Sequence, residues 1–314
     1  MKNLFGWSVG ILVGLSSCVS NVKEAEEVPA DYVNEEAQIH LGQLLFFEGR
    51  LSKDNTVGCV TCHLPGLAFT DALPKSIGVE GRMAARNSPT LFNLADHELF
   101  MFDGVITSLE VQALSPISDH NEMDSSIKSI IEKLKDDPVF RRQFKKAYKR
   151  PMDPKGITEA LAAYQKTLVS TSSRFDAFYF SDKKNALSVE EKEGWDLFKN
   201  KFDCISCHAL PHFTNGKPES NGLPILDEDY GRYRATSLES DKGKFKVPSL
   251  RNLSVTAPYM HDGRMTTLDE VLHFYGNEKK SHYADSRVTH YKMNAQERER
   301  IISFLGTLRD TVLF

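Results

Sequence analysis

Two copies of the motif Cys-x-x-Cys-His constrain this chain more than any other feature. They read Cys59-Val-Thr-Cys62-His63 and Cys204-Ile-Ser-Cys207-His208. This spacing is the attachment signature of a c-type haem: the two thiols form thioethers with the porphyrin, and the adjacent His binds the iron. The His after each second Cys, and the lack of a further Cys pair, argue against a zinc ribbon or a redox dithiol. The sequence therefore predicts two covalent haem c groups, with His63 and His208 as proximal ligands.

Length and composition indicate a globular chain with room for two haem domains. It has 314 residues, of which 40% are hydrophobic and 26% charged. These values are ordinary for a soluble globular protein, and the length accommodates two domains. The formal net charge is −4, and no basic stripe is present. We therefore expect no nucleic-acid partner.

The fifth cysteine, Cys18, follows a candidate export signal. Lys2 and an apolar run from Trp7 to Leu15 precede it, and this run is too short to span a bilayer as a mature helix. We expect residues 1–17 to be a lipoprotein-type signal peptide, with lipid on Cys18 and a tether over 18–30. The alternative is an ordinary secretory signal in which Cys18 is incidental. Both alternatives predict export to the periplasm, and the first adds a lipid anchor in the membrane.

Landmarks of the first half recur in the second half in the same order. The matched segments are Gly42–Phe46 with Gly194–Phe198, Leu64–Thr70 with Leu210–Thr214, Pro89–Leu94 with Pro248–Leu253, and Phe102–Gly104 with His261–Gly263. Four ordered matches favour an internal duplication over chance. We predict two tandem cytochrome c-like domains over residues 31–182 and 183–314.

The periodicity of apolar residues predicts a mainly α fold. The expected helices are Ser125–Lys149, interrupted at Asp136-Asp137-Pro138, then Ile157–Tyr179, Ser188–Lys201, Thr267–Tyr275 and Asn294–Leu308. Residues 50–58, 64–90 and 209–247 are rich in Gly, Pro and Asn, which is typical of loops.

Two haems permit either simple electron transfer or peroxide chemistry, and the distal side of each iron decides between them. An electron carrier needs two six-coordinate irons. A peroxidase needs one open iron and an acid–base group beside it that moves a proton between the two oxygens of peroxide.

The chain resembles the bacterial dihaem cytochrome c peroxidases, and more closely their methylamine-utilisation (MauG-like) relatives, from about Glu35 onward. The resemblance rests on both haem motifs and on four further segments, Arg86–Thr90, Phe102–Gly104, Lys246–Asn252 and Ala257–Gly263. It implies that the N-terminal domain is peroxidatic and the C-terminal domain transfers electrons. Members of this family often form homodimers, and the resemblance therefore makes a homodimer an expectation here.

The resemblance carries the distal groups of the N-terminal haem over to Gln112 and Glu122. Glu122 would be the general acid and base for O–O cleavage, and Gln112 would hydrogen-bond the peroxide. Without the resemblance to the family, both would be interpreted as solvated polar residues. Conventional members block this iron with a loop His, which would fall close to Val79 here. The loop has no His, and His97 and His120 are the nearest alternatives. We expect an open haem that needs no reductive activation.

The distal ligand of the C-terminal haem is expected to be Tyr275. Conventional peroxidases have a Met at this position, whereas MauG-like proteins have a Tyr. A thioether raises the haem potential, whereas an anionic phenolate lowers it. The alternatives are Met260 and Met265, with Tyr275 as a core aromatic. His261 is expected to orient the region between the haems.

Two further implications concern the region between the domains. Phe102 stands where relatives usually have a Trp that relays electrons, and Phe is much harder to oxidise.

The family also holds one calcium ion, whose ligands carry over to the Asn87 side chain and the carbonyls of Thr256 and Pro258. Oxygen ligands suit this hard cation.

The leading functional prediction is a peroxidase, an oxidoreductase that reduces hydrogen peroxide to water. Its electrons would come from a small c-type cytochrome or another periplasmic donor. The alternatives are a MauG-like oxidase, which uses peroxide to oxidise a protein or small-molecule substrate, and a non-catalytic dihaem electron carrier.

Overall fold

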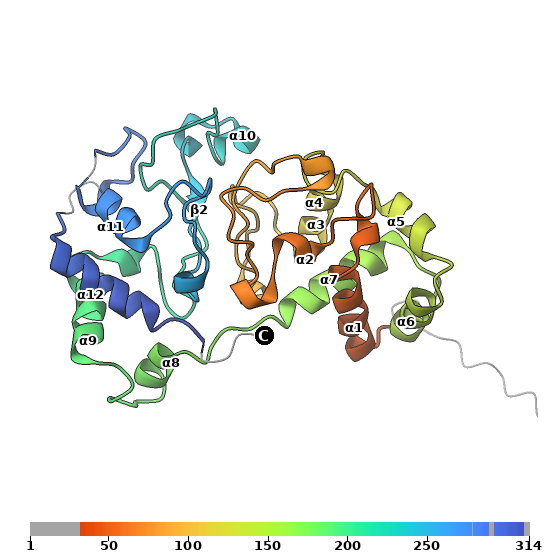
Figure 1. Ribbon diagram of the computed structural model, residues 1–314, viewed down its shortest axis with the longest axis horizontal. Coiled ribbons are helices and arrows are strands. Elements are labelled where there is room, and N and C mark those ends of the chain that lie inside the picture. Colours follow the sequence, from red (N-terminus) through yellow and green to blue (C-terminus); the bar gives the residue numbers. More distant parts are fainter. Residues whose placement is uncertain (1–31, 278, 289–291, 311–314) are drawn as a thin grey trace, which may run out of the picture. The chain divides into compact units, whose positions relative to one another are not determined.

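Helices dominate this computed structural model, which describes residues 32–277, 279–288 and 292–310 (Figure 1). The first half contains α1 Glu35–Phe46, α2 Cys59–Cys62, α3 Leu109–Gln112, α4 Leu114–Ser118, α5 Ile127–Leu134, α6 Pro138–Tyr148 and α7 Pro154–Lys166. The second half contains α8 Arg174–Tyr179, α9 Val189–Asp196, α10 Tyr233–Thr236, α11 Leu268–Asn277 and α12 Ala295–Gly306. The mainly α class is therefore confirmed. Cys18 and the expected signal peptide and tether lie outside the described residues.

One small sheet lies among the loops of the second half. Strand β1, Pro218–Glu219, pairs antiparallel with β2, Phe245–Lys246, so that Glu219 lies opposite Phe245. The described residues from Val33 onward form one compact unit. Among the described helices, none has the length and apolar character needed to cross a membrane.

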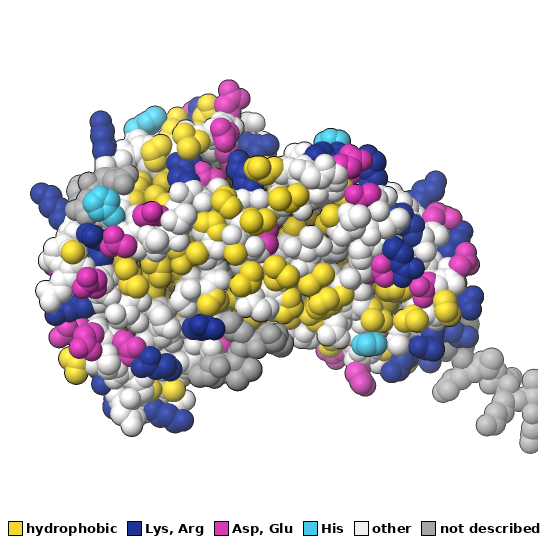
Figure 2. Space-filling view, in the orientation of Figure 1, with side chains coloured by type: hydrophobic (Ala, Val, Ile, Leu, Met, Phe, Trp, Pro, Cys, Tyr) yellow, Lys and Arg dark blue, Asp and Glu magenta, His cyan; other side chains and the backbone are white. Residues whose placement is uncertain are grey.

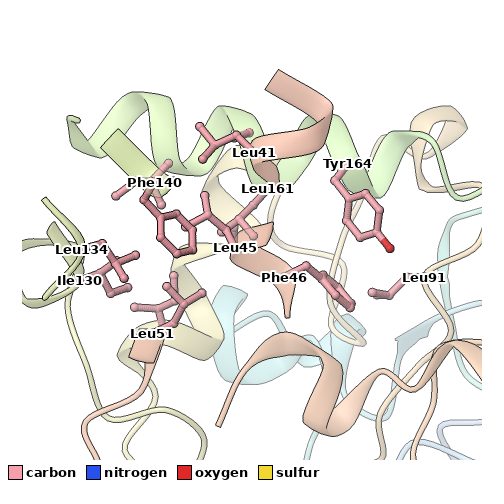
Figure 3. Close-up of a cluster of buried hydrophobic side chains, with 14 of the residues drawn as sticks. Leu41, Leu45, Phe46, Leu51, Leu91, Ile130, Leu134, Phe140, Leu161 and Tyr164 are labelled. Atoms are coloured by element: carbon pink, nitrogen blue, oxygen red, sulfur yellow. The ribbon is translucent and has the colours of Figure 1, made fainter. Parts of the chain in front are cut away.

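The core of the first half lies where α1 packs against α6 and α7 (Figure 3). Leu41, Leu45 and Phe46 of α1 are at most 1% exposed and belong to the same buried cluster as Leu161 and Tyr164 of α7. In the second half α9 packs against α12, and the core there is rich in aromatic residues. Burial of such side chains contributes about 1.5–3 kcal/mol each to folding.

Helix boundaries follow local capping where the sequence provides it. The predicted interruption after Leu134 is confirmed: the Asp137 side chain accepts from the N–H groups of Val139 and Phe140, and Pro138 is the first residue of α6. Ser188 and Asn294 likewise cap α9 and α12 through capping boxes. These side chains satisfy N–H groups that the first helical turn leaves free.

The predicted single helix over Ile157–Tyr179 is wrong, because α7 ends at Lys166 and α8 begins only at Arg174. The intervening run Thr-Leu-Val-Ser-Thr-Ser-Ser is rich in β-branched and hydroxyl residues, which weaken a helix. Ser173 then caps α8 in a capping box with Asp176. The extended segment places Ser170 against Asn93, whose side-chain oxygen accepts the Ser170 N–H at 2.9 Å.

The two halves make the same contacts at equivalent positions. A Cβ at Gly42 of α1 would lie 1.9 Å from the Ala160 carbonyl oxygen of α7, and one at Gly194 of α9 would lie 2.0 Å from the Arg300 carbonyl oxygen of α12. Only glycine permits so close a crossing in each half.

The loops that follow the haem motifs are tied down in the same way in both halves. Asn93 and Asn252 are both left-handed, with φ of 59° and 60°. The Asn93 N–H donates to the Leu168 carbonyl just after α7, and the Asn252 N–H donates to the Leu308 carbonyl just after α12. Each loop is thereby fixed to the chain just beyond one long helix, α7 in the first half and α12 in the second.

Candidate active site

The N-terminal motif presents His63 as a neutral imidazole with one nitrogen available. Its Nδ1 lies 2.8 Å from the Phe69 carbonyl oxygen and 3.3 Å from Ser88 Oγ. A carbonyl can only accept, so Nδ1 carries the proton and Nε2 keeps its lone pair. Burial lowers the pKa of His63, so the ring stays neutral at pH 7. Such an imidazole, oriented by a backbone carbonyl, fits an iron ligand.

The residues predicted for the peroxidatic site line one cavity of about 60 Å³. Its polar or sulfur-bearing walls include Cys59, Cys62, His63, Gln112 and Glu122. Apolar side chains complete it, among them Phe46, Leu91, Met123 and Leu161. An apolar pocket with a few convergent polar groups is the usual form of a cofactor or substrate site. The donor set therefore fits a covalently attached haem with polar groups in the same pocket.

Glu122 has the electrostatics of a proton-exchanging group. Burial, with a smaller contribution from the charge of Asp119, raises its pKa to about 7. Among the described residues, no cation contributes to this shift, and Glu122 lies in the turn that follows α4. A carboxyl with a pKa near 7 can both accept and return a proton at neutral pH.

Gln112 is the last residue of α3, which Ser108 caps through the Val111 N–H. Its side-chain nitrogen lies 3.7 Å from the sulfur of Met101, which is a weak acceptor. The amide therefore has hydrogen-bonding capacity left within the cavity.

The loop near Val79 packs against the turn that carries Glu122. Val79 is fully buried, and its N–H donates to the Glu122 carbonyl at 2.8 Å. Gly78 permits this contact, because a Cβ there would lie 2.4 Å from that carbonyl oxygen. Arg82, on the same loop, donates to Asp124 at 2.9 Å. The loop has no His and is held at both sides of Val79.

The alternative histidines do not line the N-terminal cavity. His120 has a 72% exposed side chain beside Asp124. His97 instead lines the larger cavity of the second half. Neither residue is placed to block the His63 site in this structure.

The C-terminal motif repeats the presentation of its proximal His. His208 Nδ1 lies 3.1 Å from the Phe213 carbonyl oxygen and 3.2 Å from that of Pro248. Both partners can only accept, so Nε2 is again the free nitrogen. Burial lowers the pKa of His208 to about 4, and the ring is neutral. His208 lines a cavity of about 270 Å³ with Cys204 and Cys207.

Tyr275 and Met260 both face this cavity, whereas Met265 does not line it. The two candidates share one neighbour, because the Asn221 side-chain nitrogen lies 3.4 Å from the Tyr275 hydroxyl and 3.6 Å from the Met260 sulfur. Burial raises the pKa of Tyr275 to about 12. The phenol is therefore protonated unless a bound cation removes its proton.

The three residues that the resemblance implies as calcium ligands lie on the same large cavity. Asn87, Thr256 and Pro258 all line it. The Asn87 side-chain nitrogen donates to the Leu73 carbonyl at 2.8 Å, so its Oδ1 is the atom available to a cation. Within the described ranges, no group of three or more His, Cys, Asp or Glu side chains could hold a metal ion.

The region around His261 is built from stacked and paired side chains. The His261 ring stacks on Phe245 with centroids 3.8 Å apart, and the Arg86 guanidinium lies 5.4 Å from the Phe245 centroid. Arg86 also makes a bidentate pair with Asp229 at 2.8 Å. Phe102 lines the cavity, and its carbonyl accepts from the Lys246 N–H at 2.6 Å.

Sequence reasoning missed Asn221, Ser88 and the Arg86–Asp229 pair. Asn221 and Asp229 lie in the predicted loop 209–247, between Thr214 and Lys246, where the sequence has loop composition and no matched segment. Ser88 and Arg86 belong to the Arg86–Thr90 segment, so their position was marked but their contacts were not.

Comparison with known proteins identifies the class. Residues 36–184 match the model of the family described as di-haem cytochrome c peroxidase. The methylamine utilization protein MauG of Methylorubrum extorquens is 34% identical over 94% of this chain and 85% of its own. The cytochrome c551 peroxidase of Nitrosomonas europaea is 30% identical over 98% of this chain and 90% of its own. A solved MauG-like protein associated with microbial copper homeostasis has a TM-score of 0.80 and 29% identity, covering 95% of this chain and 96% of its own.

The fold and these relationships define a dihaem oxidoreductase. This chain belongs to the di-haem cytochrome c peroxidase family, with MauG and MauG-like proteins among its relatives. The predicted enzyme class, a cytochrome c peroxidase with two haem c cofactors, is thereby confirmed.

Proposed function

We propose that the protein reduces hydrogen peroxide to water at the His63 site, with electrons that enter through the His208 site from a small c-type cytochrome or another periplasmic donor. The observation that carries this proposal is the shared cavity of His63, Gln112 and Glu122. These residues are separated by up to 59 positions in the sequence, yet they meet beside the two thiols of the first haem motif.

The attached haems supply the redox chemistry, and the chain supplies proton transfer and orientation. Glu122 takes a proton from the bound peroxide oxygen and delivers it to the departing oxygen, which leaves as water. Gln112 hydrogen-bonds the peroxide and holds it beside Glu122. The Phe69 carbonyl and Ser88 fix the His63 ring, and the Pro248 and Phe213 carbonyls fix His208.

The His63 site is proposed to be open at rest. The loop of Gly78 and Val79 has no His and is held against the Glu122 turn, and neither His97 nor His120 lines the cavity. The protein should therefore react with peroxide without being reduced first.

Tyr275 is proposed as the distal ligand of the His208 haem, with Met260 as the alternative. Both line the cavity, and the similarity to MauG favours the tyrosine. An anionic ligand would place this haem at a lower potential than a thioether would.

The remaining proposals concern the domains of the enzyme, its calcium ion, its localisation and its oligomeric state. The paired contacts of Gly42 with Gly194, and of Asn93 with Asn252, support tandem domains over 31–182 and 183–314 that arose by duplication. Asn87, Thr256 and Pro258 would hold one calcium ion. We also propose periplasmic localisation, a lipid anchor on Cys18 and a homodimer.

Steady-state turnover tests the proposed function. Reduced cytochrome c should be oxidised at two molecules per peroxide, without a preceding reductive step.

A second candidate, MauG-like oxidation of another protein or a small molecule, is favoured by the 34% identity to MauG and by Tyr275. Rapid reaction with peroxide but negligible turnover with reduced cytochromes would support that candidate instead.

A further inference from the structure

An aromatic cluster extends from the wall of the His208 cavity to the protein surface. Phe198 lines this cavity together with Cys204 and His208. Trp195, on α9, stacks on Phe198 with centroids 6.0 Å apart and rings 23° from parallel. Trp195 also lies 6.3 Å from Phe213, whose carbonyl holds His208. The indole is therefore one ring removed from the cavity on the side of the proximal His.

The outer end of the cluster is Tyr179 of α8. Its ring lies 5.9 Å from the Trp195 ring, edge to face, and 5.4 Å from Phe175 in a stacked arrangement. Trp195 is 8% exposed, whereas Tyr179 is 44% exposed. The step from Trp195 to Tyr179 thus leads from the buried cluster to solvent, at spacings typical of packed aromatic pairs.

The chemistry of these rings differs from that of their neighbours. The other aromatic residues of the cluster are all phenylalanines, namely Phe175, Phe178, Phe198, Phe202, Phe213 and Phe304. Phenylalanine is hard to oxidise, whereas indole and phenol can each give up one electron. Trp195 is also the only Trp in the part of the chain that the structure describes, since the second, Trp7, lies outside it. The buried indole lies nearer to the cavity and the more exposed phenol lies at the surface, which is the order that outward electron transfer requires.

We propose that Trp195 and Tyr179 form an electron relay between the His208 site and the surface, with Tyr179 as the exposed terminus. The relay rests on the proposed peroxidase function, because peroxide is the oxidant and is reduced to water at the His63 site. Trp195 gives one electron toward the His208 site and is refilled by one electron from Tyr179. The oxidised phenol loses its proton to solvent. An electron from the donor and a proton from water then restore Tyr179.

The test is to add one equivalent of hydrogen peroxide to the haem-loaded protein without a donor, and to freeze the sample for electron paramagnetic resonance. Protein made with ring-deuterated tyrosine identifies the radical, because only a tyrosyl signal narrows. The native protein should give a tyrosyl signal. Tyr179→Phe should abolish it and leave a tryptophanyl signal, and Trp195→Phe should abolish both.

Tyr259→Phe is the matched control, because Tyr259 lines the cavity itself but is not part of the cluster. It should keep the native signal. A tyrosyl signal that survives Tyr179→Phe, or one on Tyr179 that survives Trp195→Phe, would overturn the relay. Tyr179→Phe removes only the hydroxyl of a residue that is 44% exposed, so this arm does not depend on whether the Trp195 variant folds.

The haem absorption bands separate this proposal from the one on which it rests. If the bands change on addition of peroxide but the radical is elsewhere, the relay fails and the peroxidase function stands. If the bands do not change at all, both proposals fail.

Discussion

At the scale of single residues, the chemistry depends on which ionisable groups are buried without a counter-charge. Glu122 is partly buried close to one further carboxylate, Asp119, and the loss of solvent is the larger cause of its raised pKa of about 7. By contrast, Asp124, two residues later, accepts hydrogen bonds from Arg82 and Lys53, which lower its pKa to about 2. Environment alone therefore gives two neighbouring acids different pKa values, which suits Glu122 to the proton exchange proposed for it, whereas Asp124 pairs with Arg82 of the Val79 loop.

Glu122→Gln should lower kcat/KM for peroxide by about 10²–10⁴-fold, the usual contribution of a positioned acid–base group. The amide keeps the shape of the side chain but cannot exchange a proton. Stopped-flow measurement of the haem absorption change checks this. A loss below tenfold, with both haems attached, would mean that another group moves the proton.

The rate of the native protein with peroxide should fall as the pH drops below about 7, because the carboxylate that accepts the proton becomes protonated. Asp119→Asn removes a negative charge that raises the Glu122 pKa, so this acid limb should move to lower pH. The comparison is between the pH profiles of the native protein, of Asp119→Asn and of Glu122→Gln. The rate of Glu122→Gln should not change with pH in this range. An acid limb that does not move in Asp119→Asn would assign it to a different group.

Tyr275→Met should raise the reduction potential of the His208 haem if Tyr275 is its distal ligand, because a neutral thioether replaces an anionic phenolate. Met260→Leu should leave that potential nearly unchanged. Spectroelectrochemical titration of both variants decides the matter. A shift in Met260→Leu, with none in Tyr275→Met, would show that Met260 is the ligand.

At the scale of elements, each half has one close helix crossing at a glycine, α1 with α7 and α9 with α12. Both Gly42→Ala and Gly194→Ala would force a methyl group to about 2 Å from a carbonyl oxygen of the crossing helix. Overpacking of this kind costs about 1–3 kcal/mol in free energy of unfolding. Denaturant titration should show this loss in both variants. Gly306→Ala in α12 is the control, because its Cβ would meet nothing within 4 Å.

The Arg251–Asp176 pair joins the loop that follows the second haem motif to α8. Arg251 is 2% exposed and binds both carboxylate oxygens of Asp176, at 2.7 and 2.9 Å. Arg251→Ala leaves a buried carboxylate uncompensated and should cost about 3–5 kcal/mol. Arg300→Ala, which breaks the more exposed pair with Glu193, should cost at most about 1 kcal/mol. Equal losses in the two variants would contradict the assigned role of burial.

Local sequence predicted the elements whose ends are fixed locally. Asp137, Pro138, Ser188 and Asn294 place helix ends through contacts with residues at most three positions away. The break between α7 and α8 could not be predicted in this way, because Ser170 is held by Asn93, 77 positions earlier. The same contrast applies to the site. The Cys-x-x-Cys-His spacing predicted His63 and His208, but Asn221 contacts Tyr275 across 54 positions and no motif marks it.

At the scale of the whole molecule, long-range contacts join the loop that follows the first haem motif to the loop that follows the second. Arg86 reaches Asp229 across 143 positions, and Phe102 accepts from Lys246. On the face shown in Figure 2, cationic and anionic side chains are interspersed, and hydrophobic side chains gather across its middle. These contacts fix the loops of both haem motifs within one folded unit.

The central claim is that the His63 site is open in the fully oxidised protein, and one measurement tests it directly. The electron paramagnetic resonance spectrum of the ferric protein should show one high-spin and one low-spin haem. One equivalent of hydrogen peroxide, added without any reductant, should then change the haem absorption bands at once. Two low-spin haems that ignore peroxide until one electron is added would contradict the account and would mean that a distal ligand blocks the His63 site.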